Sequence, residues 1–246
     1  MKLKVVGSGS HGNCYLLQTQ TEVLVIEAGM KFLEVKKALN FDISKIVGCL
    51  ISHEHQDHGK SVKDLLNAGI GVYASGGTLE ALGIADTFNS FTVTSGEIVK
   101  VGTFEVLSFP TRHDAAEPVG FLIRHSECGT VLFATDTYYL QQRFKGLNNV
   151  LIECNYEPVS LKEKFETGIV VKPLYERLLT SHMSLNTCLK MLALNDLKAV
   201  CNIVLIHLSD SNSDAGLFQS QVEAATGKKV IVADSGLEIE FNKTAF

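Results

Sequence analysis

The sequence predicts an α/β (α+β) protein in which two β-sheets are covered by helices. Strand candidates follow one another directly in the first 30 residues, whereas later ones alternate with helical patterns. This order favours two sheets with helices packed against them. No low-complexity segment divides the chain, and its four prolines are scattered. We therefore expect one domain that spans residues 1–246, a length sufficient for a buried core.

Short apolar runs define the strand candidates. In chain order these runs cover residues 3–6, 14–18, 22–27, 46–52, 71–74, 104–109, 120–125, 130–136, 150–154, 202–207 and 230–233. Apolar residues three to four positions apart predict helices between several of them. These helices cover residues 61–68, 77–82, 174–179, 185–194 and 214–225.

The most informative segment is Ser52-His53-Glu54-His55-Gln56-Asp57-His58-Gly59, which directly follows an apolar run. Three imidazoles and a carboxylate so close together are ligands that suit a divalent ion. If His53 and His55 continue the strand, its period of two places both rings on one face, where they can share an ion. Asp57 and His58 follow as the chain turns, so they suit a second ion. We therefore predict a metal centre here.

Three later residues stand at the ends of apolar runs, in the same context as His53. They are His113, Asp136 and His207. A site at one rim of a sheet needs its ligands at strand ends, so we predict that all three join the metal centre. Two other histidines lack this context and are predicted not to bind metal: His11 and His125.

A glycine loop near the N-terminus resembles a dinucleotide-binding turn. Gly7-x-Gly9-x-x-Gly12 follows a strand candidate, and Glu27 lies about twenty residues beyond the first glycine. That fingerprint requires a helix after the third glycine, but residues 14–26 form a strand, turn and strand pattern. We expect no dinucleotide site, and we expect the loop to bring backbone amides and Asn13 near the metal rim.

Composition excludes several classes of protein. A hydrophobic content of 46% and a charged content of 20% are ordinary for a soluble globular protein. No apolar stretch approaches a membrane span, and Gly7-Ser8-Gly9 breaks the N-terminus too soon for a signal peptide. The six cysteines show no Cys-x-x-Cys pair, which favours reduced thiols and a cytoplasmic location. A net charge of −5 without a basic run argues against a long nucleic acid as partner.

The chain resembles the metallo-β-lactamase-fold hydrolases over its entire length, with the histidine-rich octet as the family's defining motif. The resemblance implies an αββα sandwich of two mixed sheets flanked by helices, with two zinc ions per chain. It also implies a ligand set for each ion: His53, His55 and His113 for one, Asp57, His58 and His207 for the other, and Asp136 as the bridge. A bridging aspartate without a cysteine ligand differs from true β-lactamases. Glu27 stands where many members carry Asp, outside these ligands.

Further motifs narrow the resemblance. Ser181-His182-Met183-Ser184, Ile206-His207-Leu208-Ser209 and Glu153 are similar to residues of the ribonuclease Z branch. The protruding tRNA-gripping arm of that branch has no counterpart in the sequence, so tRNA is not the expected substrate. Residues 7–13, 134–137 and 207–212 resemble two closer groups. One is the small bacterial DNA exonucleases of this fold, and the other is the phage anti-Pycsar phosphodiesterases, which destroy cyclic nucleotide defence signals.

The implied chemistry is hydrolysis of a phosphodiester. Two bridged zinc ions would neutralise phosphoryl charge and activate water. Asp57, besides binding the second ion, would orient the attacking water. His182 lies outside both ligand sets and is the candidate general acid for the departing sugar oxygen, with Glu153 holding its ring in the charged form. The alternative for His182 is a surface residue at the start of a helix.

The expected function is hydrolysis of 3′,5′-cyclic nucleotides such as cyclic CMP and cyclic UMP to 5′-monophosphates, which would counter an antiviral signal in the host cytoplasm. A DNA exonuclease is one alternative. A glyoxalase-type thioester hydrolase, which does not need His182 or Glu153, or a non-catalytic metal-binding partner protein is another. The resemblance to the anti-Pycsar enzymes also implies a homodimer. The charged segment 156–180 is the expected interface or lid.

Overall fold

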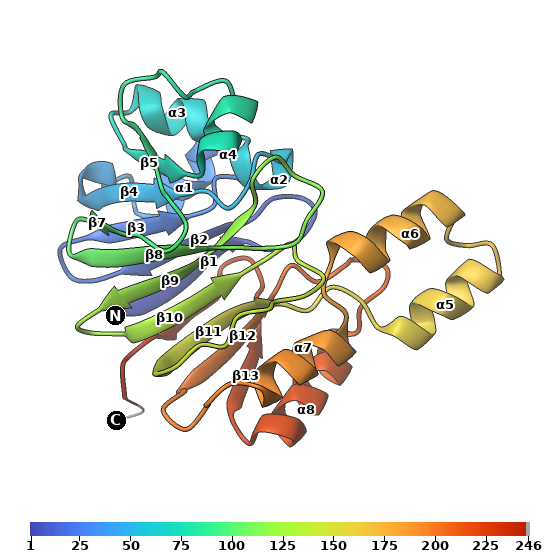
Figure 1. Cartoon of the computed structure of the whole chain (residues 1–246). Helices are drawn as coiled ribbons and strands as arrows, with labels where there is room; N and C mark the ends of the chain where they lie inside the picture. The colour runs from blue at the N-terminus through green and yellow to red at the C-terminus, as the bar shows by residue number, and fades with distance from the viewer. Residues whose placement is uncertain (245–246) are drawn as a thin grey trace.

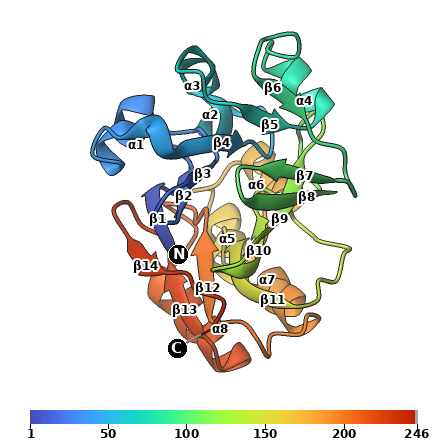
Figure 2. The same cartoon turned by 90° about the vertical axis from the view of Figure 1, so that its left-hand side faces the viewer.

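The structure is a computed structural model that describes residues 1–244. Within these residues, two seven-stranded sheets pack face to face, and helices cover their outer faces (Figures 1 and 2). Each sheet is mixed, since three of its strand pairings are antiparallel and three are parallel. The predicted sandwich of two mixed sheets flanked by helices is confirmed.

The first sheet has the strand order β14-β1-β2-β3-β4-β5-β6. Its strands are β1 (Lys2–Gly7), β2 (Cys14–Gln18), β3 (Val23–Ile26), β4 (Ile46–Leu50), β5 (Val72–Ala74), β6 (Ser90–Thr92) and β14 (Glu238–Glu240). The second sheet has the order β13-β12-β11-β10-β9-β8-β7. Its strands are β7 (Ile98–Val101), β8 (Phe104–Pro110), β9 (Val119–His125), β10 (Gly129–Ala134), β11 (Leu147–Glu153), β12 (Asn202–Ile206) and β13 (Lys229–Val232).

Helices fall into three groups around these sheets (Figure 1). The first sheet is covered by α1 (Phe32–Ala38), α2 (Gln56–Gly59), α3 (Val62–Asn67) and α4 (Gly76–Ala81), with a 3₁₀ turn at Ile43–Lys45. The second sheet is covered by α7 (Leu185–Ala193) and α8 (Ala215–Thr226). The remaining pair, α5 (Pro158–Glu166) and α6 (Lys172–Ser181), projects from the body of the molecule. No helix among residues 1–244 is long and apolar enough to cross a membrane.

The hydrophobic core consists of three layers, one between the two sheets and one between each sheet and its helices. Side chains such as Tyr15, Phe121 and Phe133 are fully buried between the two sheets, where alternate residues of each strand face inward. Separate apolar clusters fill the space between each sheet and its helices. All six cysteines are free, and five of them are buried in these layers, as the sequence predicts.

The topology gathers several strand ends at one rim. Strands β10, β11 and β12 run parallel, and β8 runs in the same direction because it is two antiparallel pairings away from β10. In the first sheet, β3 and β4 are also parallel. Polar residues that directly follow these strands therefore face the same region between the sheets, which is the arrangement that open α/β sheets use for ligand sites.

Some elements differ from the sequence prediction. The strand expected over 46–52 ends at Leu50, and the octet continues as a loop and then α2. Strands β6, β7 and β14 were not predicted, since they are short edge strands with exposed residues. Helix α5 was also missed, although Pro158 at its first position and the Glu157 side chain that caps Ser160 N at 2.6 Å are typical of a helix start.

Candidate metal centre

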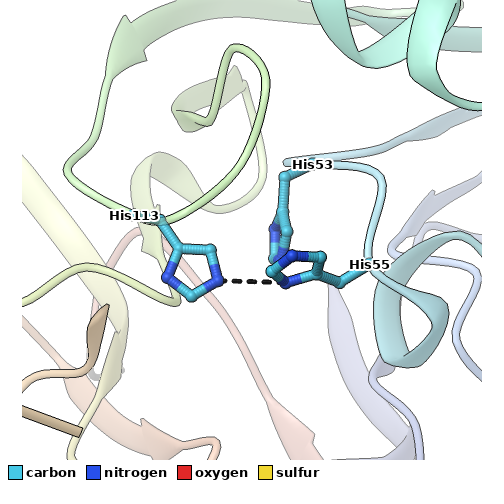
Figure 3. Close-up of side chains that lie close together, drawn as sticks. All are labelled: His53, His55 and His113. Carbon is cyan, nitrogen blue, oxygen red and sulfur yellow. Dashed lines mark hydrogen bonds between the residues drawn. The ribbon is translucent and has the colours of Figure 1, made fainter. Parts of the chain in front are cut away.

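The octet forms a tight loop that brings its histidines together. His53 lies in the loop after β4 with 1% of its surface exposed, and His55 is the N-cap residue of α2. The two residues therefore do not continue the strand, and the condition on which a shared face depended is not met. Their rings nevertheless lie 4.7 Å apart between centroids, because the loop turns back on itself before α2 begins. Figure 3 shows the two rings facing His113, which comes from a different segment.

The nitrogen atoms of the first predicted ligand set lie close together, and two of them present lone pairs that an ion could accept. His113 Nε2 lies 3.1 Å from His55 Nδ1. The other nitrogen of His113 lies 2.9 Å from the Ser181 carbonyl oxygen, which can only accept, so Nδ1 carries the proton and Nε2 presents a lone pair. His53 Nε2 is buried without a hydrogen-bond partner among the described residues. Two nitrogens that share a tetrahedral zinc at 2.0–2.1 Å stand roughly 3.3 Å apart, which fits this geometry.

The second predicted set gathers around the start of α2. Asp57 Oδ2 lies 3.2 Å from His207 Nε2 and 3.4 Å from His58 Nε2. Burial differs among the three: His58 is fully buried and His207 almost so, while the Asp57 side chain keeps 26% of its surface exposed. The donor atoms of this set lie within 4.8 Å of one another, as do those of the first set.

Asp136 lies between the two sets. Its Oδ2 is 3.0 Å from His58 Nε2, and its Oδ1 is 3.9 Å from His113 Nε2 and 3.7 Å from His207 Nε2. Asp136 has a backbone φ of 46°, in the left-handed region that residues other than glycine seldom adopt. This turn directs the carboxylate into the space between the sheets as soon as β10 ends. The position is the one that a bridging ligand requires.

The pKa shifts of His53 and Asp136 suit metal binding. Burial, with the nearby His58 charge, lowers the pKa of His53 well below its usual range, so this ring is neutral as a ligand must be. Burial alone would raise the pKa of Asp136, but His207 and His58 outweigh it and hold the pKa well below the usual range. Burial lowers the pKa of His58 and of His207, but Asp136 and the other nearby carboxylates outweigh it and raise both, so these two rings must lose a proton to bind an ion. A buried His53 nitrogen without a hydrogen-bond partner and an ionised Asp136 carboxylate in one cluster fit a divalent cation, which would supply the missing contact.

Two residues lie behind the candidate ligands, and one of them, Glu27, was not predicted to take part in the site. Glu27, which is fully buried, follows β3, and its Oε2 lies 3.3 Å from His58 Nδ1. A carboxylate behind a ligating histidine fixes the ring and turns its other nitrogen toward the metal. The available signal was its position at a strand end on the same rim. Asn13 was expected near the rim, and its Nδ2 donates to the Asp57 carbonyl oxygen at 3.2 Å.

His182 and Glu153 form a contact beside the ligands. His182 Nδ1 lies 2.7 Å from Glu153 Oε1 and 3.3 Å from Asp136 Oδ1. The second oxygen of Glu153 accepts from the backbone amides of Thr137 at 2.9 Å and Met183 at 3.0 Å. Burial lowers the pKa of His182, but the charge of Glu153 outweighs it and raises the pKa to about 9. His182 follows α6 and keeps 12% of its side chain exposed, so it is not the surface residue of the alternative hypothesis.

The glycine loop and the two remaining histidines lie outside the candidate metal centre. The glycine loop leads into the strand β2 without a helix, as predicted. His11 is 90% exposed beside Asp210, and His125 lies 3.0 Å from Thr103 Oγ1. Neither belongs to any cluster of metal-ligand atoms among residues 1–244.

A cleft of ≈ 450 Å³ opens beside the first ligand set. It includes His113, and its other walls are Thr111, Arg112, Asp114, Pro118, Tyr138, Thr180 and Ser181. A larger cavity of ≈ 570 Å³ lies where β10 begins, lined by residues such as Arg124 and Gly129. Since the candidate ligands follow the opposite end of β10, the smaller cleft is the one next to the chemistry.

Comparisons with known proteins agree with this geometry. Residues 23–208 match the family model described as the beta-lactamase superfamily domain. The chain is 31% identical over 174 residues to exodeoxyribonuclease YycJ of Bacillus anthracis and 29% identical over 170 residues to exodeoxyribonuclease WalJ of Streptococcus pneumoniae. These alignments span 66% and 63% of the chain and equal shares of the relatives, so the chain covers slightly less than two thirds of their length. The fold also matches the metallo-β-lactamase fold protein YhfI of Bacillus subtilis, with a TM-score of 0.76, 16% identity and coverage of 97% and 98%.

Proposed function

We propose that this chain, which belongs to the beta-lactamase superfamily, is a metal-dependent hydrolase whose substrates are 3′,5′-cyclic nucleotides. In this proposal, cyclic CMP, cyclic UMP and related compounds are opened to nucleoside 5′-monophosphates, which would counter a cyclic nucleotide signal of a host. The observation that supports phosphodiester hydrolysis is the His182–Glu153 pair next to both candidate ligand sets, since a phosphodiester needs a proton for its departing oxygen. The size and charge of the site favour the cyclic substrate.

The metal-binding residues would supply the electrophilic side of the reaction. His53, His55 and His113 would hold one zinc ion, Asp57, His58 and His207 would hold the second, and Asp136 would lie between them. When bound, such ions neutralise phosphoryl charge and lower the pKa of water at the site. The partly exposed Asp57 would also accept a hydrogen bond from the attacking water and orient it.

His182 would act on the opposite side of the phosphorus. Its Nδ1 donates to Glu153, and this is the one hydrogen bond that the ring makes among residues 1–244, so Nε2 is available to the substrate. Because the ring is partly exposed and next to Asp136, Nε2 can donate its proton to the 3′ oxygen as the ring of the cyclic phosphate opens. Glu153 keeps the imidazolium charged and fixes its orientation, so it is a positioning residue.

The size and charge of the site favour a small substrate. The cleft of ≈ 450 Å³ beside His113 falls within the range of small-molecule sites, about 300–1,000 Å³. Arg177 is already paired at 3.3 Å with Asp114, a residue of the cleft wall. A net charge of −5 also disfavours a surface that follows the phosphates of a strand.

A DNA exonuclease is the second candidate, and the names of the two curated relatives favour it. Both candidates use the same ligands and the same general acid, so the difference lies in what the surrounding surface binds. An exonuclease would bind several successive phosphates, and its activity would fall steeply as salt increases.

One comparison of substrates tests these proposals. The zinc-loaded protein would be mixed with cyclic CMP, cyclic UMP, linear single-stranded DNA and a glutathione thioester, and products would be followed by chromatography. We expect 5′-CMP and 5′-UMP, with activity that survives moderate salt. Salt-sensitive release of nucleotides from DNA with intact cyclic CMP would favour the exonuclease, and cleavage of the thioester alone would exclude both.

We also propose that the protein acts as a homodimer through the projecting pair α5 and α6. Ile169 and Val171, in the connection between these helices, are 73% and 62% exposed. Apolar side chains gathered on a projection favour contact with another protein surface. The end of α6 also forms a wall of the cleft through Thr180 and Ser181, so a neighbouring chain that contacts this pair would lie close to the substrate.

A further inference from the structure

The cleft beside His113 has one cation and one aromatic ring without partners on its walls. Arg112 is exposed, and within residues 1–244 no carboxylate lies at ion-pair distance from its guanidinium, in contrast to the paired Arg177. Tyr138 is 40% exposed. In the part of the chain that the structure describes, its ring stacks on no other ring and its hydroxyl has no hydrogen bond. Both side chains are therefore available to a ligand.

The backbone holds these two residues firmly against each other. Arg112 N donates to Thr137 Oγ1 at 3.0 Å, and Tyr138 N donates to Arg112 O at 3.3 Å. Thr137 is fully buried, and its own amide donates to Glu153 at 2.9 Å. A fixed main chain with two free side chains is the arrangement of a recognition site, because little backbone entropy is lost on binding.

The position next to the ligands defines what the cleft can hold. Arg112 directly precedes the ligand His113, and Tyr138 follows the candidate bridge Asp136 by two residues. A phosphodiester whose phosphorus lies at the ligands would therefore extend its attached group into this cleft. A volume of ≈ 450 Å³ is sufficient for one planar ring and its sugar.

We propose that this cleft is the base subsite of a nucleotide, in which the base stacks on Tyr138 and a carbonyl oxygen of the base accepts hydrogen bonds from Arg112. The proposal rests on the proposed function for the position of the phosphate. Guanidinium offers five donors and no acceptor, so it favours bases that carry a carbonyl oxygen, namely cytosine, uracil and guanine, over adenine.

Binding of products without turnover tests the stacking contact. The affinities of 5′-CMP, 5′-AMP and ribose 5-phosphate for the zinc-loaded protein would be measured by isothermal titration calorimetry. We expect 5′-CMP to bind about 10-fold more tightly than ribose 5-phosphate, which lacks a base. Tyr138→Ala should remove this advantage and Tyr138→Phe should keep it. The matched control is Tyr139→Ala. Tyr139 is 45% exposed and lines an adjoining cleft, which shares Arg112 with the proposed subsite but not Tyr138, so this variant should also keep the advantage.

A second substitution tests the hydrogen-bonding partner. Arg112→Met should weaken binding of 5′-CMP about 10-fold, while the affinities for 5′-AMP and ribose 5-phosphate change much less. Arg124→Met is the control, since this exposed arginine lies where β9 ends, far from the ligands. An unchanged ratio of CMP to ribose 5-phosphate affinity in Tyr138→Ala would overturn the subsite. Equal weakening of all three ligands by Arg112→Met would overturn the base contact and assign Arg112 to the phosphate.

These measurements separate the inference from the proposed function. Calorimetry detects the base subsite whether or not cyclic nucleotides are hydrolysed. Hydrolysis of cyclic CMP with no effect of Tyr138→Ala would leave the function intact and remove the subsite. Tight, base-dependent binding of 5′-CMP without hydrolysis of cyclic CMP would support the subsite and remove the proposed function.

Discussion

The carboxylate of Glu153 accepts a hydrogen bond from His182 Nδ1 at 2.7 Å while its second oxygen accepts from two backbone amides. A fully buried carboxylate with three hydrogen bonds has no freedom to rotate, so it fixes the imidazole that it contacts. The strand β11 carries Glu153, whereas His182 follows α6, and the contact therefore joins the second sheet to the projecting helices.

The first prediction concerns the role of His182. His182→Ala should lower turnover of cyclic CMP on the order of 100-fold, because the departing 3′ oxygen then leaves without a proton. Zinc content should stay unchanged, since His182 is not among the predicted ligands. Bis(p-nitrophenyl) phosphate has a leaving group of low pKa and should show a much smaller loss.

His11→Ala provides the control for this experiment, because His11 is an exposed histidine outside every ligand cluster among the described residues. It should retain the activity of the unchanged protein on both substrates. Equal losses on both substrates in His182→Ala would remove the general-acid role.

The second prediction concerns metal content. Seven convergent ligands are too many for one tetrahedral ion, so metal-replete protein should contain two zinc ions per chain by elemental analysis. His55→Ala and Asp57→Ala should each abolish turnover, since either loss opens one coordination shell.

A chelator should inactivate the protein, and added zinc should restore its activity. A stoichiometry of one ion in the active protein would contradict the pair.

The third prediction concerns Glu27, which contacts the ligand His58 from behind. Glu27→Ala should weaken zinc binding at the second set by about 10- to 100-fold, because the imidazole loses the carboxylate that orients it. Competition with a chromogenic chelator measures this affinity directly. Glu22→Ala, which removes an acidic residue that contacts Thr103 instead, is the control. Unchanged zinc affinity in Glu27→Ala would mean that the contact has no such role.

The sequence predicts which residues gather at the rim better than it predicts how they are held. His113, Asp136 and His207 are predicted to lie there because each follows an apolar run, and parallel strands place such residues at one rim. The path of the octet was not predicted, since a period of two cannot show that β4 ends at Leu50. Its ligands still converge because the loop and α2 are both short.

Long-range contacts explain what the sequence could not show. The Ser181 carbonyl that fixes His113 lies 68 residues away, and no local pattern predicts that pairing. The left-handed backbone of Glu27, Asp136 and His207 is also set by the tertiary structure, since each residue type normally avoids this region. The strain is located where the strands must turn sharply to direct side chains into the site.

The fourth prediction follows from a close approach between two loops. A Cβ on Gly29 would lie 1.7 Å from the Asp57 carbonyl oxygen, which no rearrangement of a side chain can relieve. Gly29→Ala should therefore displace the backbone of Asp57, lower the free energy of unfolding by about 2 kcal/mol or more, and reduce zinc binding.

Gly216→Ala is the matched control, because Gly216 lies in α8 and a Cβ there meets only the Asp214 side chain at 3.6 Å. It should leave zinc binding unchanged and raise stability by about 0.5–1 kcal/mol, since alanine favours the helix. Chemical denaturation and zinc titration measure both effects. Normal stability and zinc content in Gly29→Ala would contradict the predicted collision.

The last prediction concerns assembly through the projecting helices. Replacing both Ile169 and Val171 by Ser should convert a dimer into a monomer in light scattering, because these exposed side chains would lose their apolar contact across the interface. Phe88→Ser is the control, since Phe88 is 88% exposed just before β6 at the edge of the first sheet, whereas α5 and α6 follow β11 of the second sheet. It should remain dimeric. If the partner chain covers the substrate cleft, the monomer should show a raised KM for cyclic CMP with intact zinc content. A monomeric parent protein, or a dimer that tolerates the double substitution, would remove this surface as the interface.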